Sequence, residues 1–217
     1  MSNTLFLNID GVLADFSKQL SVKTGYALEE VQQFLQKELF DADEKKLTAQ
    51  ECQLKNKIEK VVSEKDFYTS MPVVEGARTV LGDLKKRFDK VYLFSRLITT
   101  HIKDKQLNEV CSLKKQWVLE KVDPSFPNEQ ILTTYMPAEK LMLSRVHSVL
   151  IDSTRKNVNR WVCHYIRNAN LFPKGATGIV FVNAQQLNND LEAKGFVKTI
   201  KQASSRFKLI YPQNVRE

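Results

Sequence analysis

The chain has 217 residues, of which 42% are hydrophobic and 27% charged, and this composition excludes a disordered or fibrous protein. No apolar stretch approaches the roughly 20 residues that a membrane-spanning helix needs, and the N-terminus lacks the features of a secretion signal. We therefore expect a cytoplasmic chain with one domain, or one domain carrying a smaller inserted lobe. The three scattered cysteines predict free thiols: Cys52, Cys111 and Cys163.

The net charge of +8 is unevenly distributed along the chain. Residues 1–100 carry 15 basic and 15 acidic side chains, whereas residues 101–217 carry 18 and 10. A basic half can attract nucleic acid, an anionic membrane or a phosphorylated substrate. Because its charges are dispersed, with no basic run longer than two residues, a solvated basic face is favoured over a nucleic-acid groove.

Five short runs rich in apolar, β-branched and aromatic residues predict strands. They are residues 4–9, 90–94, 130–133, 148–151 and 178–182. Most of them are followed by a polar turn and then by helical spacing, which predicts βαβ units and a parallel sheet with helices on both faces. The tail, residues 197–217, has no clear period and predicts either a last strand with an extension or the approach to a further domain.

The first two predicted strands are separated by about 80 residues, which is too long for a single crossover helix. Apolar residues at helical spacing predict a first helix around 28–39 and a second over about 43–62. The first apolar stripe comprises Leu28, Val31, Leu35 and Leu39, with Phe34 beside it. The second comprises Leu47, Leu54, Ile58, Val61 and Val62. The insert therefore predicts a small helical lobe.

Polar side chains follow three of the predicted strands at the point where each strand ends. Asn8 and Asp10 follow the first strand, Ser95 the second and Asp152 the fourth. The carboxyl ends of parallel strands share one edge of a sheet, where such proteins bind ligands. Oxygen ligands suit Mg²⁺, and a hydroxyl with an ammonium such as Lys140 suits phosphoryl oxygens. The alternative for the first stretch is a buried strand that ends in an Asp-Gly turn.

The segment from Asn8 to Leu13 resembles the first motif, Asp-x-Asp-Gly, of the haloacid dehalogenase superfamily of phosphohydrolases. It is closest to the 5′(3′)-deoxyribonucleotidase-like branch, whose Asp-Gly-Val-Leu-Ala-Asp-Phe is reproduced from Asp10 to Phe16. The resemblance spans roughly residues 4–185. Further similarities occur in order at Phe67-Tyr68, Met71-Pro72, Glu75-Gly76-Ala77, Ser95, Cys111 with Lys115, Trp117 and Val118, and Leu150-Ile151-Asp152.

The resemblance implies a Rossmann-like core of residues 1–16 and 71–217, with a helical cap formed by residues 17–70. It also implies Mg²⁺-dependent hydrolysis of phosphomonoesters through an aspartyl-phosphate. In that scheme the side chain at position 8 attacks phosphorus, and Asp10 acts as general acid and then general base. The phosphate-binding residues would be Ser95, Arg96 and Lys140. The metal ligands would be Asn8, Asp10 and Asp152.

Two positions depart from the pattern of this branch. Position 8, the nucleophile position, is Asn, whose neutral amide oxygen is a much weaker nucleophile than a carboxylate and a weaker ligand for Mg²⁺. Three explanations for this Asn stay open: natural loss of activity, an engineered Asp-to-Asn replacement, and a misaligned motif. The second departure is Ser153, which follows Asp152 where the branch has another acid. In addition, Arg145 competes with Lys140 for the role of third-motif cation.

The substrate class stays open between a nucleoside monophosphate and a phosphotyrosine-bearing protein. The cap of the nucleotidases carries aromatic residues that stack on the base, and residues 41–66 contain no counterpart. Phe67 and Tyr68 are candidate stacking residues, although core packing explains at least one of them. The alternative function is a catalytically dead pseudophosphatase that binds a phosphorylated ligand. Nucleic-acid binding is the weakest reading, and the sequence does not indicate an oligomeric state.

Overall fold

A computed structural model describes residues 4–37, 39, 43–97, 104–134, 148–154, 157–158, 161, 177–181 and 207–210. Internal contacts divide the chain into two compact units. The sheet unit comprises Met1–Leu13, Val74–Arg96 and Pro127–Glu217. The helical unit comprises Ala14–Val73 and Leu97–Phe126.

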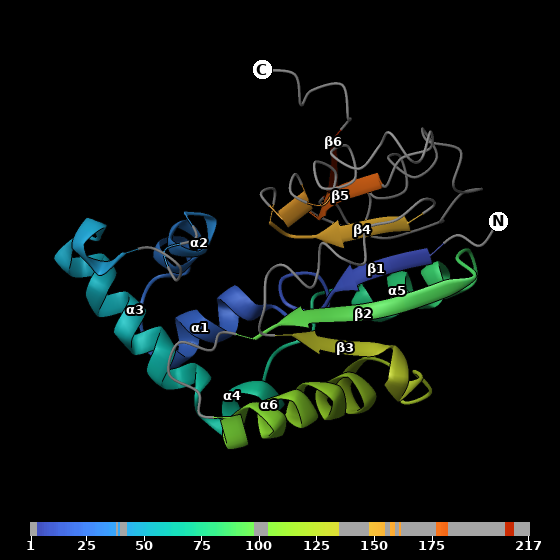
Figure 1. Cartoon of the computed structure of the whole chain (residues 1–217), viewed down its shortest axis with the longest axis horizontal. Coiled ribbons are helices and arrows are strands. Elements are labelled where there is room, and N and C mark those ends of the chain that lie inside the picture. The colour runs from blue at the N-terminus through green and yellow to red at the C-terminus, as the bar shows by residue number, and fades with distance from the viewer. Residues whose placement is uncertain are drawn as a thin grey trace. The chain divides into compact units, whose positions relative to one another are not determined.

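In the described part of the chain, the sheet unit has six strands in the order β3-β2-β1-β4-β5-β6 (Figure 1). Their bounds are β1 (Thr4–Asn8), β2 (Lys90–Arg96), β3 (Ile131–Thr134), β4 (Ser148–Asp152), β5 (Thr177–Phe181) and β6 (Phe207–Ile210). Neighbouring strands from β3 to β5 are parallel, and β6 pairs antiparallel to β5. The five parallel strands match the five predicted runs, and the tail supplies a sixth. The predicted α/β class with a parallel, Rossmann-like sheet is confirmed.

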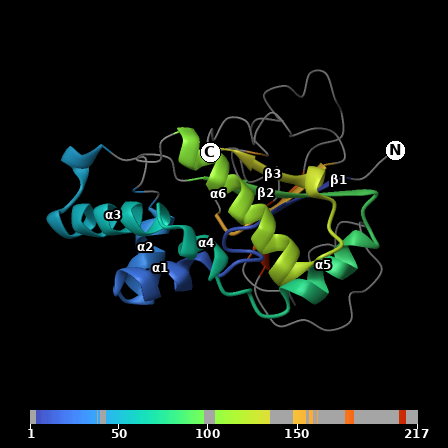
Figure 2. The same cartoon turned by 90° about the horizontal axis from the view of Figure 1, so that it is seen from below.

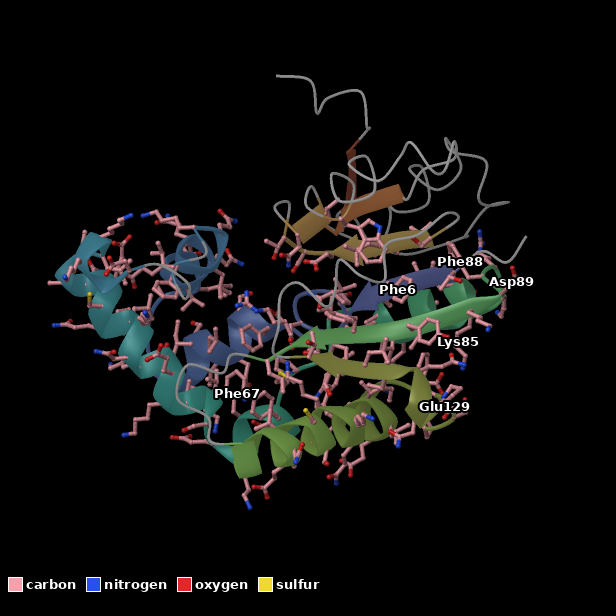
Figure 3. All side chains as sticks on the ribbon, in the orientation of Figure 1. Phe6, Phe67, Lys85, Phe88, Asp89 and Glu129 are labelled. Atoms are coloured by element: carbon pink, nitrogen blue, oxygen red, sulfur yellow. The ribbon has the colours of Figure 1, made fainter. Side chains whose placement is uncertain are left out.

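The core of the sheet unit surrounds β1, whose five residues are all buried. A strand flanked by parallel neighbours is covered on both faces, which explains its apolar sequence. The ring of Phe6, labelled in Figure 3, stacks on Tyr92 of β2 with centroids 5.3 Å apart, and it also contacts Trp161. Helix α5 (Ala77–Lys85) contacts β2, and the 3-10 helix η4 (Asn128–Gln130) precedes β3.

The helical unit contains five α-helices among its described residues, together with two shorter turns. The α-helices are α1 (Phe16–Thr24), α2 (Leu28–Gln36), α3 (Ala49–Val62), α4 (Lys65–Thr69) and α6 (Asp104–Trp117). The shorter elements are a 3-10 helix, η2 (Glu44–Lys46), and a π-helical turn, η3 (Val118–Val122). Helix α1 contacts α2 and α3, α3 contacts α4, and α4 contacts α6 (Figure 2).

The apolar stripe predicted for the second helix is largely confirmed, whereas only part of the first stripe is fully buried. The four later residues of the second stripe, from Leu54 to Val62, are buried on α3. On α2 the fully buried residues are Val31 and Phe34, and the helix ends before Leu39. The bulkier aromatic ring at position 34 takes the centre of the buried face, because burying it removes more apolar area from water.

Residues 97–126 join the helical unit, although the sequence-based boundaries assign them to the core domain. Helix α6 packs on α4, and the indole Nε1 of Trp117 donates a hydrogen bond to the carbonyl oxygen of Met71 at 2.9 Å. Such contacts between distant segments leave no trace in local periodicity. The boundaries 1–16, 17–70 and 71–217 stay predictions about separable domains.

Two bulk expectations can be compared with the described part of the chain. No helix there is both long and apolar enough to cross a membrane. Cys52 and Cys111 are free thiols, as expected, whereas Cys163 lies outside the described residues.

Candidate functional site

The candidate site begins with the turn that follows β1. Asn8 is in register with Phe94 of β2, and the N–H of Ile9 continues this pairing by donating to the Phe94 carbonyl at 2.7 Å. Gly11 then adopts a φ of +80°, a left-handed conformation that residues with a Cβ rarely take. The N–H of Leu13 donates back to the Ile9 carbonyl at 2.9 Å, which closes the turn.

The side chain of Asn8 is buried beneath this turn, with 7% of its surface exposed. Its Nδ2 donates a hydrogen bond to the main-chain carbonyl oxygen of Asp10 at 2.8 Å. The hydroxyl of Ser153, in the loop after β4, lies 3.4 Å from the same oxygen, at the long end of the range for a hydrogen bond. Two donors, one from the last residue of β1 and one from the loop after β4, therefore face one carbonyl oxygen.

The loops after β1 and β4 touch at Gly11. A Cβ at position 11 would lie only 2.8 Å from the Cβ of Ser153, well inside van der Waals contact. Glycine is therefore required here both for its conformation and for the close approach of the second loop. This contact holds the Asp10 carbonyl near Ser153.

Ser95 links the second strand to the same turn. It lies near the carboxyl end of β2, is fully buried, and its Oγ donates to Oδ2 of Asp10 at 2.6 Å. A serine hydroxyl has one proton to donate. That proton is used on Asp10 in this structure, so Ser95 must release Asp10 before it can donate to a ligand.

Asp152 ends β4 and is also fully buried. Its Oδ1 accepts the backbone N–H of Thr154 at 2.8 Å, and its Oδ2 accepts the side-chain Nδ2 of Asn157 at 3.2 Å. The bond to the N–H two residues later is an Asx turn. Sequence reasoning missed Thr154 and Asn157 as partners. The Asp-Ser-Thr stretch was the available signal for the turn.

The structure brings together the predicted residues on the central strands. Asn8, Asp10 and Ser95 are joined by hydrogen bonds, and Asp152 follows the pair formed by Leu7 and Ile151 on adjacent strands. Arg96 pairs in register with Thr134 of β3, and strand alternation directs it to the opposite face of the sheet from Ser95. Lys140 and its competitor Arg145 lie outside the described residues.

The donor groups at this edge do not fit Mg²⁺ as they are arranged. Mg²⁺ requires oxygen ligands, but Asn8 turns its nitrogen toward the Asp10 carbonyl, whose lone pairs already face two donors. The Asp152 carboxylate accepts N–H donors on both oxygens. No group of three His, Cys, Asp or Glu residues that could hold a metal occurs within the described ranges.

Comparison with known proteins identifies similar solved structures but no family. A hydrolase from Pseudomonas syringae has a TM-score of 0.40 and 13% identity, covering 81% of this chain and 82% of that chain. L-2-haloacid dehalogenase from Xanthobacter autotrophicus, with chloropropionic acid covalently bound, has a TM-score of 0.40 and 12% identity over 91% and 85%. The unknown transcript 4 protein from Saccharomyces cerevisiae has a TM-score of 0.32 and 13% identity over 76% and 87%.

No family model matches the chain, and no curated protein matches it. The TM-scores are too low to support a conclusion about shared fold or activity. The architecture and the candidate site therefore stand on the strand order and contacts of this chain alone.

Proposed function

We propose that this chain is a phosphohydrolase scaffold of the haloacid dehalogenase type, directed at phosphomonoesters, in which Asn8 replaces the nucleophilic carboxylate. One observation carries the proposal. Asn8, Asp10, Ser95 and Asp152 come from three segments far apart in sequence, and all lie at or near the carboxyl ends of the adjacent strands β2, β1 and β4. Ligand chemistry in parallel sheets is concentrated at this edge.

The proposed reaction needs a carboxylate at position 8. Its oxygen would form a bond to phosphorus while the bond from phosphorus to the leaving oxygen breaks, and Asp10 would give that oxygen a proton. Asp10 would then take a proton from the water that hydrolyses the acyl phosphate. The amide oxygen of Asn8 carries no full charge, and its nitrogen is held by the Asp10 carbonyl. This copy should therefore not turn over.

The remaining roles follow from the resemblance. Ser95 and Lys140 would donate to phosphoryl oxygens, with Arg96 as a weaker candidate because strand alternation turns it to the other face of the sheet. We expect Mg²⁺ to bind the form of this scaffold that has a carboxylate at position 8. In the present chain its donor set is incomplete, so no step is assigned to it.

The direct test is to change Asn8→Asp and assay hydrolysis of p-nitrophenyl phosphate with Mg²⁺ present or chelated by EDTA. We expect no hydrolysis by the unmodified chain and EDTA-sensitive hydrolysis by the variant. A second change, Asp10→Asn, should then reduce the rate of the variant by about 100-fold or more, because proton transfer is lost. If Asn8→Asp stays inert over a broad panel of phosphomonoesters, the proposed function is wrong.

The natural substrate is proposed to be either a protein phosphotyrosine or a nucleoside monophosphate. Phe67 and Tyr68, the aromatic residues considered as base-stacking partners, are both buried in the helical unit, with ring centroids 5.1 Å apart. Their packing in that unit explains these residues without a nucleobase. The active variant should therefore be assayed on phosphotyrosine peptides and on nucleoside monophosphates in parallel.

A binding module without hydrolysis is the second candidate function. It is favoured by the neutral side chain of Asn8, which removes one negative charge from a site that would otherwise repel an anionic phosphate. This reading expects phenyl phosphate to raise the melting temperature of the unmodified chain. The increase should disappear in Ser95→Ala.

A further inference from the structure

The central contact of the site is a short hydrogen bond within one turn. Asn8 Nδ2 lies 2.8 Å from the main-chain oxygen of Asp10, and the side chain that makes this bond is nearly buried. The left-handed Gly11 and the bond from Leu13 to Ile9 return the chain over the end of β1. The carbonyl of Asp10 is consequently held against the side chain of position 8.

The two ends of the Asn8 amide are not interchangeable in this place. With nitrogen toward the carbonyl, the contact is an N–H···O hydrogen bond. With oxygen toward it, two oxygens would face each other at the same 2.8 Å separation, and a cation would be needed between them. Binding one cation between Asn8 and the Asp10 carbonyl therefore requires breaking the hydrogen bond and rotating the amide.

The carboxylate of Asp152 is likewise hydrogen-bonded without a cation. It is fully buried, and N–H groups from Thr154 and Asn157 donate to its two oxygens at 2.8 and 3.2 Å. Charge-assisted hydrogen bonds of this kind stabilise a carboxylate without a metal. The second carboxylate, Asp10, accepts the hydroxyl of Ser95 at 2.6 Å.

We infer that Asn8 makes this edge of the sheet a hydrogen-bonded site that excludes a divalent cation, with its amide N–H groups occupying the place of the metal. The inference rests on the proposed function in taking this edge as the ligand site. The inference can be tested separately from the proposed function, because it depends on the hydrogen bonds of the unmodified chain and not on catalytic turnover.

The first experiment uses the unmodified full-length chain. Mn²⁺, followed by electron paramagnetic resonance, serves as a probe for a Mg²⁺-type oxygen site. We expect no saturable binding and the same melting temperature in Mg²⁺ as in EDTA. Saturable Mn²⁺ binding that Asp152→Asn abolishes would overturn the inference without the need for any other variant.

The second experiment uses Asn8→Asp, which is isosteric but places an oxygen against the Asp10 carbonyl in either rotamer. In EDTA the variant should melt below the unmodified chain, and saturating Mg²⁺ should raise its melting temperature by roughly 5 °C or more. It should also bind one Mn²⁺. Adding Asp152→Asn should remove both responses.

The matched control is Asn128→Asp, which adds the same charge at an exposed position of η4 in the same unit. It should show no response to Mg²⁺. If Asn8→Asp responds no more than this control, the inference is wrong. A variant that gains the cation but hydrolyses nothing would support the inference and contradict the proposed function. If the variant hydrolyses phosphomonoesters and the unmodified chain also binds Mn²⁺, the proposed function is supported and the inference is wrong.

Discussion

Each unit of this protein buries an amide side chain that donates to a main-chain carbonyl, and the two amides differ in what surrounds them. In the sheet unit, Asn8 donates to Asp10, two residues away, at 2.8 Å. In the helical unit, Gln19 is 5% exposed and donates to the carbonyl of Phe67, 48 residues away, at 3.1 Å. Its Nε2 also donates to Ser70 Oγ at 2.7 Å.

The surroundings decide what each amide can do. Around Asn8 lie the polar ends of neighbouring strands, including a buried carboxylate. The ring of Phe67, whose carbonyl accepts from Gln19, packs edge-on against Phe16 with centroids 5.5 Å apart. Gln19 therefore satisfies a buried carbonyl and joins α1 to α4, whereas Asn8 shapes a polar site.

The largest expected effect comes from making the same acid substitution in the helical unit. Gln19→Glu places a carboxylate against the Phe67 carbonyl in a site with 5% exposure, so we expect a loss of about 3–5 kcal/mol in the free energy of unfolding. Urea denaturation measures this loss. Mg²⁺ should not restore stability, in contrast to Asn8→Asp.

Gln19→Leu is the control, because it removes the hydrogen bonds without adding charge. It should cost about 1–3 kcal/mol, the penalty for leaving a buried carbonyl without its donor. Recovery of Gln19→Glu by Mg²⁺ would show that the two amides are equivalent and would contradict the comparison.

The next effect concerns the turn that positions Asn8. In Gly11→Ala the alanine must adopt a φ of +80°, which should lower the free energy of unfolding by about 1–2 kcal/mol. Its Cβ must also displace Ser153, which should lower it by about 1–3 kcal/mol more. Thermal unfolding should reveal both costs together. Gly76→Ala has a similar φ of +76° but no atom within 4 Å, so it should show the conformational cost alone.

A second substitution separates the two costs at Gly11. Ser153→Gly removes the atoms that a Cβ at position 11 would meet, so the double variant should recover the packing part of the loss. If the two substitutions are simply additive, the loops after β1 and β4 do not touch as described.

The smallest effect is a pH dependence at the start of α3, where the groups are exposed. The N–H of Thr48, then Lys37 and the Thr48 hydroxyl, hydrogen-bond to the Glu51 carboxylate and lower its pKa from 4.5 to about 2. A lowered pKa in the folded state means that the stabilisation is present above pH 4.5 and is lost as the pH falls toward 2.

Glu51→Gln should remove this part of the acid sensitivity. The melting temperature of the variant should fall less than that of the unmodified chain between neutral pH and pH 3, by a small margin because the site is solvent-exposed. Lys37→Gln, which removes the second contribution, should behave in an intermediate way. Equal acid sensitivity of all three chains would contradict the assignment.

The fold class and the edge that carries the site were accessible from the sequence. Alternating runs of strand and helix predicted the parallel sheet, and the polar residues after Ile9, Phe94 and Ile151 marked the edge where the candidate site lies. These are local signals, since strand propensity and chain direction decide them. Asn8, Asp10 and Ser95 do meet, as that reading expected.

What sequence did not reveal depends on contacts between distant segments. The inclusion of α6 in the helical unit depends on its packing against α4 and on the bond from Trp117 to Met71, which no periodicity encodes. The direction of the Asn8 amide is set by the path of the chain through Gly11, so the residue type alone predicted a weak metal ligand and not a donor to Asp10. Lys140 stays a prediction because it lies outside the described residues.

The chain leaves the sheet unit after Leu13 and returns at Val74, and the contacts at this point affect how the length of the segment between them can change. The N–H of Val74 donates to the carbonyl of Leu13 at 2.8 Å, and the N–H of Asp15 donates to the carbonyl of Pro72 at 2.8 Å. Departure and return thus lie side by side on a short two-stranded stem. The stem holds these two ends together, so the length of the segment between them does not set the spacing of β1 and α5, although α4 in that segment packs against α6. The helices between Asp15 and Pro72 are therefore constrained by their packing against one another and against α6, and not by the distance between β1 and α5.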